Sequence, residues 1–181
     1  MLFTSSAPYG THQTTDYNSY TMDHSNKIVE IRNGGRFNQS IILKYKDDTE
    51  WVFLNNKQEE RFCGFLYLQK ALEESNLNTI QAAENKIAIH DRKIIYLSRW
   101  HGDKKPDVSE TSGYSKELST LEQDIGFTDM PGNANLRKKD NIIYVFDTEK
   151  HSFSKGVHEK IDSFVHQHKA IRSILEESLK D

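Results

Sequence analysis

Oxygen-bearing side chains gather in one stretch of the second half of the chain. Asp129 precedes a Pro-Gly turn, Asn133 and Asn135 follow that turn, and Asp147 comes directly after the apolar run at residues 142–146. Carboxylate and amide oxygens are hard ligands, which suit Mg²⁺ better than Zn²⁺. Phosphoryl transfer needs such a set, because one carboxylate must orient the attacking hydroxyl while other groups hold magnesium against the nucleotide phosphates. This stretch is therefore the best candidate for chemistry.

The pattern resembles that of the protein-kinase and aminoglycoside/choline-kinase superfamily. In that family an Asp is followed by an Asn about five residues later, a short hairpin, and an apolar strand that ends in a metal-binding Asp. The interval from Asp129 to Asp147 is 18 residues, close to the family's usual spacing. The resemblance implies that Asp129 is the catalytic acid, that Asn133 or Asn135 is the metal-binding amide, and that Asp147 is the metal-binding acid. Mg²⁺ and ATP are the cofactors that it implies.

The resemblance also implies positions for nucleotide binding in the first half of the chain. Gly34 and Gly35 would stand for the glycine-rich phosphate loop, although two glycines between strands are also ordinary turn residues. Lys44 or Lys57 would be the lysine that binds phosphate. Glu60 would be the helix residue that pairs with this lysine, although an acid in the first turn of a helix is also favoured by the helix dipole.

The sequence departs from the kinase pattern at several points. Ala134 occupies the position five residues after Asp129, the run at residues 51–54 has no lysine, and only 34 residues follow Asp147. A full activation segment and a large helical lobe do not fit into that length. The alternative is therefore a catalytically inactive, pseudokinase-like or unrelated α+β module that binds a protein partner. In that case Asp129 and Asn133 would turn the loop, and Asp147 would begin the next helix.

Two other local patterns could carry chemistry. The tripeptide 101–103 (His-Gly-Asp) also occurs in the catalytic loop of small-molecule kinases, but no strand that ends in Asp follows it at a suitable distance, so we interpret it as a connector. The C-terminal quarter contains four histidines: His151, His158, His166 and His168. Residues two apart on a helix point to different sides, so we expect surface histidines here and not a metal site.

The elements that must position these residues can be read from the periodicity of the apolar residues. Runs at residues 28–31, 41–43 and 51–54, separated by turn residues, predict a three-stranded antiparallel meander. Apolar residues at helical spacing predict a helix that ends near Ser75; they are Phe62, Phe65, Leu68 and Leu72. Runs at 86–90 and 94–97 then predict a hairpin that returns to the same sheet. This order is the one that the kinase resemblance implies for a small lobe.

The second half predicts mainly helices. Residues 99–113 lack periodicity and are expected to form a connector, and a helical stripe follows at Leu118, Leu121 and Ile125. A short hairpin is expected around residues 138–141, and one long or two shorter helices should close the chain. The predicted fold is α+β, with a small antiparallel sheet and one helix followed by a reduced, mainly helical lobe. We expect a flexible tail at 1–26 and one domain at 27–181, with a sheet-rich lobe (27–98) and a helical lobe (99–181).

Composition limits the classes of partner. The chain has 181 residues and a formal charge of −3, with basic and acidic residues mixed along it, so we expect no nucleic-acid partner. Cys63 is the only cysteine, which excludes an internal disulfide and suits a reducing compartment. No apolar run is long enough to cross a bilayer, and the first residues do not resemble an export signal. We expect a cytoplasmic protein, and its Glu-rich C-terminal residues resemble the tails of some bacterial effectors that act in a host cytosol.

Overall fold

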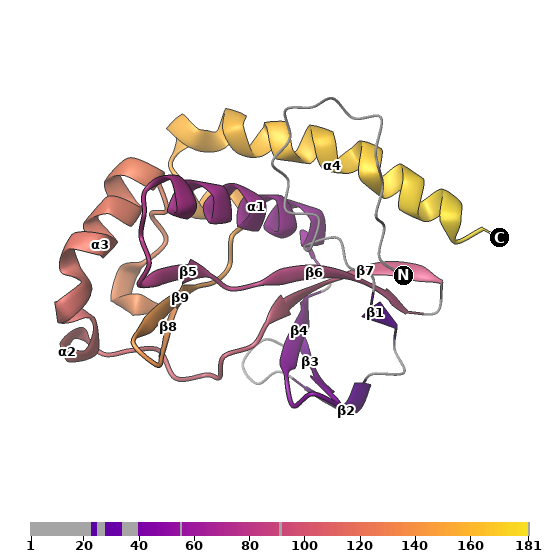
Figure 1. The fold of residues 1–181 in the computed structure, drawn as a ribbon, viewed down its shortest axis with the longest axis horizontal. Helices are drawn as coiled ribbons and strands as arrows, with labels where there is room; N and C mark the ends of the chain where they lie inside the picture. The colour runs from indigo at the N-terminus through magenta and orange to yellow at the C-terminus, as the bar shows by residue number, and fades with distance from the viewer. Residues whose placement is uncertain (1–22, 25–27, 34–39, 55, 91, 181) are drawn as a thin grey trace.

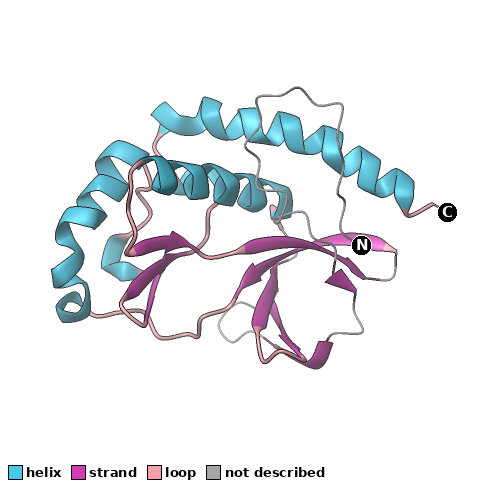
Figure 2. Cartoon of the chain, viewed as in Figure 1, coloured by secondary structure: helices cyan, strands magenta, loops and turns pink. Residues whose placement is uncertain are grey.

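The protein has an α+β fold, and the predicted fold class is confirmed. The computed structural model describes residues 23–24, 28–33, 40–54, 56–90 and 92–180. The strands lie on one side of the molecule and the two longest helices lie on the other (Figure 2). Gly34 and Gly35 lie outside the described residues, as does the predicted tail except for Asp23 and His24.

The larger sheet has the strand order β1-β6-β7-β4-β3-β2. Its strands are β1 (Asp23–His24), β2 (Ile28–Asn33), β3 (Ser40–Tyr45), β4 (Glu50–Leu54), β6 (Asn85–His90) and β7 (Lys93–Arg99). The predicted meander is confirmed, because β2, β3 and β4 pair antiparallel in sequence order. The predicted hairpin β6–β7 is also confirmed, and β7 joins it to β4. Strand β1, which was not predicted, pairs parallel with β6.

Helix α1 (Gln58–Glu74) follows the meander, as the apolar spacing predicts. The four residues of the predicted stripe are buried, but so are Cys63, Leu66 and Tyr67 on other sides of the helix. The reason is that α1 lies between two layers: strands β5, β6 and β7 contact it on one side and the C-terminal helix contacts it on another (Figure 1). A helix covered on several sides needs apolar residues around most of its circumference.

A second, smaller sheet has the order β5-β9-β8. The hairpin of β8 (Leu136–Lys139) and β9 (Ile142–Val145) is confirmed, and its two turn residues, Asp140 and Asn141, have the positive φ angles of 50° and 64° that tight hairpins require. Strand β5 (Ile80–Ala82) was not predicted and pairs parallel with β9. A strand from the range 27–98 thus shares a sheet with strands from the range 99–181.

The connector after β7 leads into a series of short helices. Helix α2 (Val108–Thr111) begins at a capping box in which Asp107 accepts from the amide of Glu110. Helix α3 (Ser115–Thr120) continues into a π-helical turn (Leu121–Ile125), so the predicted helix over this region is confirmed. Leu121 and Ile125 enter the core together with residues of α1, β8 and β9.

The chain ends in one long helix, α4 (His158–Ser178), which lies alongside α1 (Figure 1). Ile161 packs in the same core cluster as the smaller sheet, whereas Leu175 packs with the residues between α1 and the larger sheet. Cys63 is a free cysteine and is fully buried. Within the described part of the chain, no helix has both the length and the apolar character needed to span a bilayer.

Candidate functional site

The segment between β9 and α4 carries the candidate site, and it is held tightly against α1. The hydroxyl of Thr148 donates to the main-chain carbonyl of Arg61 at 2.7 Å. A Cβ atom on Gly64 would lie 1.8 Å from the carbonyl oxygen of Thr148, so only glycine allows this approach. Asp147, just before Thr148, has a φ of 52°, a conformation in which Asp is more readily accommodated than most residues. The contact with α1 therefore fixes where the Asp147 carboxylate lies.

The structure brings Asp129 and Asp147 together. Potential ligand atoms of Asp129, Asp147 and His151 all lie within 4.8 Å of one another. Asp129 is held in place by Ser152, whose hydroxyl donates to its carboxylate at 3.2 Å and whose carbonyl accepts from its amide at 3.3 Å. Two carboxylates and an imidazole that meet in this way form a candidate site for a divalent cation.

A charge network centred on the buried Glu149 adjoins these three residues and includes His151. Arg61 Nη2 lies 2.6 Å from Glu149 Oε1, and both side chains are less than a tenth exposed. Lys57 Nζ and His151 Nδ1 lie 3.1 Å and 3.0 Å from Glu149 Oε2. Arg61 Nε also makes a long contact of 3.5 Å with Asp147 Oδ1. Arg61 of α1, and Lys57 directly before this helix, thus place positive charge beside the acids of the 147–149 segment.

The charge on Asp147 is incompletely compensated. Its Oδ1 is enclosed and makes no hydrogen bond to any described residue, although the side chain as a whole is 38% exposed. Burial, followed by repulsion from Glu149, raises the pKa of Asp147 above its ordinary value, and the attraction of Arg61 only partly opposes this. The described residues around Asp147 therefore neutralise its carboxylate only in part.

The two predicted metal-binding amides lie in different places. Asn135 is next to Asp129, because its Nδ2 donates to the Asp129 carbonyl at 2.8 Å. Asn133 instead donates to the carbonyl of Pro106 at 3.0 Å, and thereby ties its loop to the connector. Among the described residues, neither amide belongs to this group of three side chains or to a second such group, which is formed by Glu60, Glu149 and His151.

The predicted phosphate-binding residues are also dispersed. Lys44 Nζ lies 3.4 Å from Asp48 in the turn between β3 and β4. Lys57 sits at the N-terminus of α1 and pairs with Glu149, not with the predicted partner Glu60. Glu60 accepts a hydrogen bond of 2.8 Å from the amide of Lys150, and so helps to anchor the segment that carries the candidate ligands.

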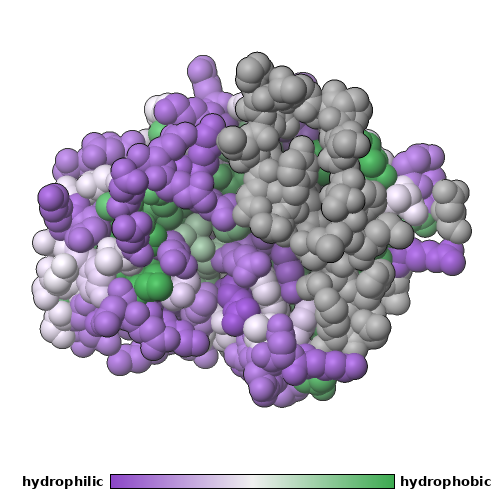
Figure 3. All heavy atoms as spheres, in the orientation of Figure 1, coloured by the Kyte–Doolittle hydropathy of each residue, from purple (hydrophilic) through white to green (hydrophobic). Residues whose placement is uncertain are grey.

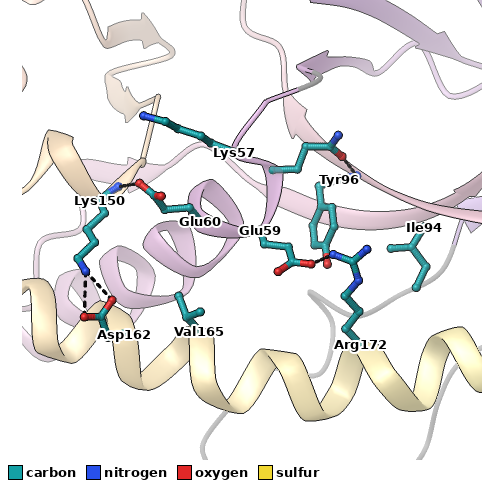
Figure 4. A pocket seen from close by; sticks show the side chains of 10 residues that line it. Lys57, Glu59, Glu60, Ile94, Tyr96, Lys150, Asp162, Val165 and Arg172 are labelled. Carbon is teal, nitrogen blue, oxygen red and sulfur yellow. Dashed lines mark hydrogen bonds and ion pairs between the residues drawn. The ribbon is translucent and has the colours of Figure 1, made fainter.

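A pocket of about 500 Å³ adjoins this network, between the N-terminus of α1 and helix α4 (Figure 4). Its charged residues are mostly paired with one another: Lys150 with Asp162 at 2.7 Å, and Arg172 with Glu59. Lys57, also in the lining, pairs with Glu149, which does not line the pocket (Figure 4 shows Lys57 at the N-terminus of α1). Because its charges are largely neutralised internally, the pocket offers less to a charged ligand than the group around Asp147 does.

Sequence reasoning gave no site role to Arg61 or Glu149, and it took His151 for a surface residue and not for a metal ligand. Glu149 lies two residues after Asp147, so this pair of acids could have drawn attention to Glu149. Its buried partner Arg61 lies 88 residues earlier in the chain, and local spacing does not connect the two. The prediction of surface histidines is wrong for His168, which is 1% exposed and pairs with the Tyr96 hydroxyl at 2.6 Å. A signal existed, because His168 continues the apolar spacing of α4. His151, in contrast, is exposed.

The tripeptide at residues 101–103 lies in the connector between β7 and α2, as the sequence predicts. The ring of His101 stacks on Tyr144 of β9 with a centroid distance of 4.0 Å. Burial, together with the nearby charges of Arg99 and Lys139, lowers the pKa of His101 to about 4, so its ring is neutral at pH 7. His101 thus packs as an uncharged aromatic residue against the smaller sheet.

The sequence comparisons identify no relative. No protein-family model matches the chain, and no curated protein matches it significantly in sequence. The functional argument therefore rests on the geometry of the site.

Proposed function

We propose that this protein binds a divalent metal ion through Asp129, Asp147 and His151, and that the metal holds the phosphates of a nucleotide such as ATP. The observation that supports the proposal is the approach of these three side chains to within 4.8 Å of one another, from segments on either side of the β8–β9 hairpin. A second support is the enclosed Asp147 Oδ1, whose contact with a described residue is the 3.5 Å ion pair with Arg61 Nε, longer than an ordinary hydrogen bond.

The ligand set indicates which ions to test. Two carboxylates suit Mg²⁺, as the sequence predicts, while an imidazole nitrogen favours Mn²⁺ or a later transition metal. His151 Nδ1 lies 3.0 Å from Glu149. A proton on Nδ1, donated to Glu149, would leave Nε2 unprotonated, and this arrangement is common in histidines that bind metals. Mn²⁺ and Mg²⁺ are therefore the first ions to compare.

A phosphotransferase related to kinases is the activity that would fit such a site. The position of Asp129 in the sequence predicts that it orients the acceptor hydroxyl. Its closeness to Asp147 instead favours a role for Asp129 as a second metal ligand. Lys57, half exposed at the edge of the network, is the side chain that could reach a phosphate, because it carries a flexible charge beside Glu149.

Thermal unfolding tests the proposal. A ligand at about 100 times its dissociation constant adds about 2.7 kcal/mol to the native state, which for a domain of this size raises the midpoint by roughly 5–10 °C. We expect such a rise with Mn²⁺ or Mg²⁺, a further rise with ATP, and loss of both in Asp147→Asn. Asp48→Asn is the matched control, because Asp48 also has a positive φ, of 62°, but lies in an exposed turn.

A catalytically inactive interaction module is the second candidate. The observation that favours it is that Lys57 and Lys44 are each already paired with an acid of the chain itself. An unchanged midpoint with millimolar metal and nucleotide, in both the parent protein and Asp147→Asn, would favour this candidate and reject the first.

We further propose that the protein works in a reducing cytosol, either that of its own cell or that of a host into which it is delivered as an effector. The support is the buried, unpaired Cys63, which such a compartment tolerates. Fractionation of cells that produce the protein, with and without a secretion system, distinguishes these two settings.

A further inference from the structure

Strand β2 forms an edge of the larger sheet, and two of its apolar side chains are exposed. In the part of the chain that the structure describes, β3 is the only strand that pairs with β2. Val29 and Ile31 are 56% and 63% exposed, and both belong to the small group of large apolar residues that lie on the surface. A hydrophobic patch is visible at the lower edge of the molecule in Figure 3, where Figure 1 places β2. Exposed edges of this kind readily pair with another strand.

A row of apolar side chains that crosses β4, β3 and β2 ends in an exposed residue at this edge. Ile31 is the cross-strand partner of Leu43, and Leu43 is the partner of Trp51. Leu43 and Trp51 are buried, with 6% and 4% exposure, whereas Ile31 at the end of the row is largely exposed. A further strand beside β2 would place a side chain next to Ile31 and continue the row.

The charges on β2 fit a second copy of the same strand. Glu30 and Arg32 flank Ile31 and point to the opposite face of the sheet, where Arg32 already bonds to Glu50. In an antiparallel pair of β2 strands with a two-fold axis at Ile31, each Glu30 lies opposite the other copy's Arg32. An axis at Glu30 or at Arg32 would instead place two like charges directly opposite each other, which is unfavourable. Only the axis at Ile31 brings opposite charges together.

We propose that β2 is a homodimerisation surface, in which two copies pair antiparallel about Ile31 and extend the larger sheet across both molecules. Such a dimer is isologous, since the same strand contributes to both sides of the interface. One short strand buries little area, so the association is weak and concentration-dependent.

Sedimentation equilibrium tests this proposal. The protein is measured up to about 0.5 mM, because interfaces that bury less than roughly 1,200 Å² are weak. We expect a monomer–dimer equilibrium that is lost in Ile31→Lys. Val108→Lys is the matched control, because Val108 is an apolar residue with 80% exposure on helix α2, and its replacement should leave the equilibrium unchanged.

Charge exchange tests the register. Glu30→Arg and Arg32→Glu should each weaken self-association by roughly tenfold, because two attractive cross-strand pairs become repulsive. An equimolar mixture of these two variants should recover the dimer, since every cross-strand pair in the mixed dimer is again of opposite charge. A protein that stays monomeric over the whole concentration range overturns the proposal, and so does a dimer that persists in Ile31→Lys or a mixture that does not recover.

Discussion

The close contact between Gly64 and Thr148 provides a sharp test of how the candidate site is built. In Gly64→Ala the new Cβ would overlap the carbonyl oxygen of Thr148 at 1.8 Å, and it would lie 2.9 Å from the carbonyl carbon. The atoms that it meets belong to the backbone and cannot rotate away as a side chain could. The 147–149 segment must therefore move off α1, or α1 must shift within the core.

The expected change in the free energy of unfolding combines two destabilising contributions and one stabilising contribution. Overpacking a dense interior costs typically about 1–3 kcal/mol, and an overlap this severe belongs at the upper end. The hydrogen bond from Thr148 to the Arg61 carbonyl would be lost in addition, at about 1 kcal/mol. Against this, replacing a helical glycine by alanine stabilises a helix by about 1 kcal/mol. We expect a net destabilisation of about 3 kcal/mol.

Urea unfolding, followed by fluorescence and circular dichroism, measures this change as a lower midpoint at constant slope. Gly113→Ala is the control, since no atom lies within 4 Å of a Cβ placed at Gly113, and its stability should change by less than about 0.5 kcal/mol. Gly64→Ala should also lose any stabilisation by Mn²⁺, because Asp147 moves with Thr148. A Gly64→Ala protein as stable as the parent would refute the account of the site.

Three further predictions follow from buried groups. Arg61→Met should lower the free energy of unfolding, measured in urea, by about 3–5 kcal/mol, because the Glu149 carboxylate stays buried without its main partner. Adding Glu149→Leu should recover most of this loss. Equal stability of the single and double variants would contradict the prediction. Burial lowers the pKa of His168 from 6.5 to about 4, so between these values the unfolded state binds a proton that the folded state does not, and stability should fall by an amount on the order of 3 kcal/mol as pH drops through that range. In His168→Gln the stability should depend less steeply on pH. Some dependence should remain, because the pKa of His101 is lowered in the same direction. If the stability of the variant fell with pH as steeply as that of the parent, His168 would not be the group responsible. Burial raises the pKa of Cys63 to about 12, so a thiol reagent at pH 8 should modify it only as the protein unfolds, and rapid labelling of the native protein would argue against its position in the core.

The elements with a clear apolar period could be predicted from the sequence. The meander, α1, the β6–β7 and β8–β9 hairpins and the C-terminal helix each carry their signal within a short window, because local spacing decides which face is buried. Strand β5 could not be predicted, since its three residues become a strand only through pairing with β9. Its formation is a tertiary effect, and local propensity contains no trace of it.

The candidate site was predictable only in part. The two acids, Asp129 and Asp147, were singled out by residue type and spacing, and the structure brings them close together. Arg61 was not singled out, because it lies in an ordinary charged stretch of α1 and its importance comes from burial against Glu149. The roles of Asn133 and Lys44 depend on loop directions that spacing does not specify.

The parallel pairing of β5 with β9 has a consequence for how the chain reaches its native state. Ile80 finds its partner at Ile143, and α1 is covered by α4 only after the whole segment between them has been made. Contacts between residues so distant in sequence slow folding. The chain loses the entropy of closing the intervening loop before these contacts contribute any favourable free energy. During translation the side of α1 that α4 covers stays exposed until the last helix has been made, so the nascent protein passes through a period in which chaperones can bind this apolar surface.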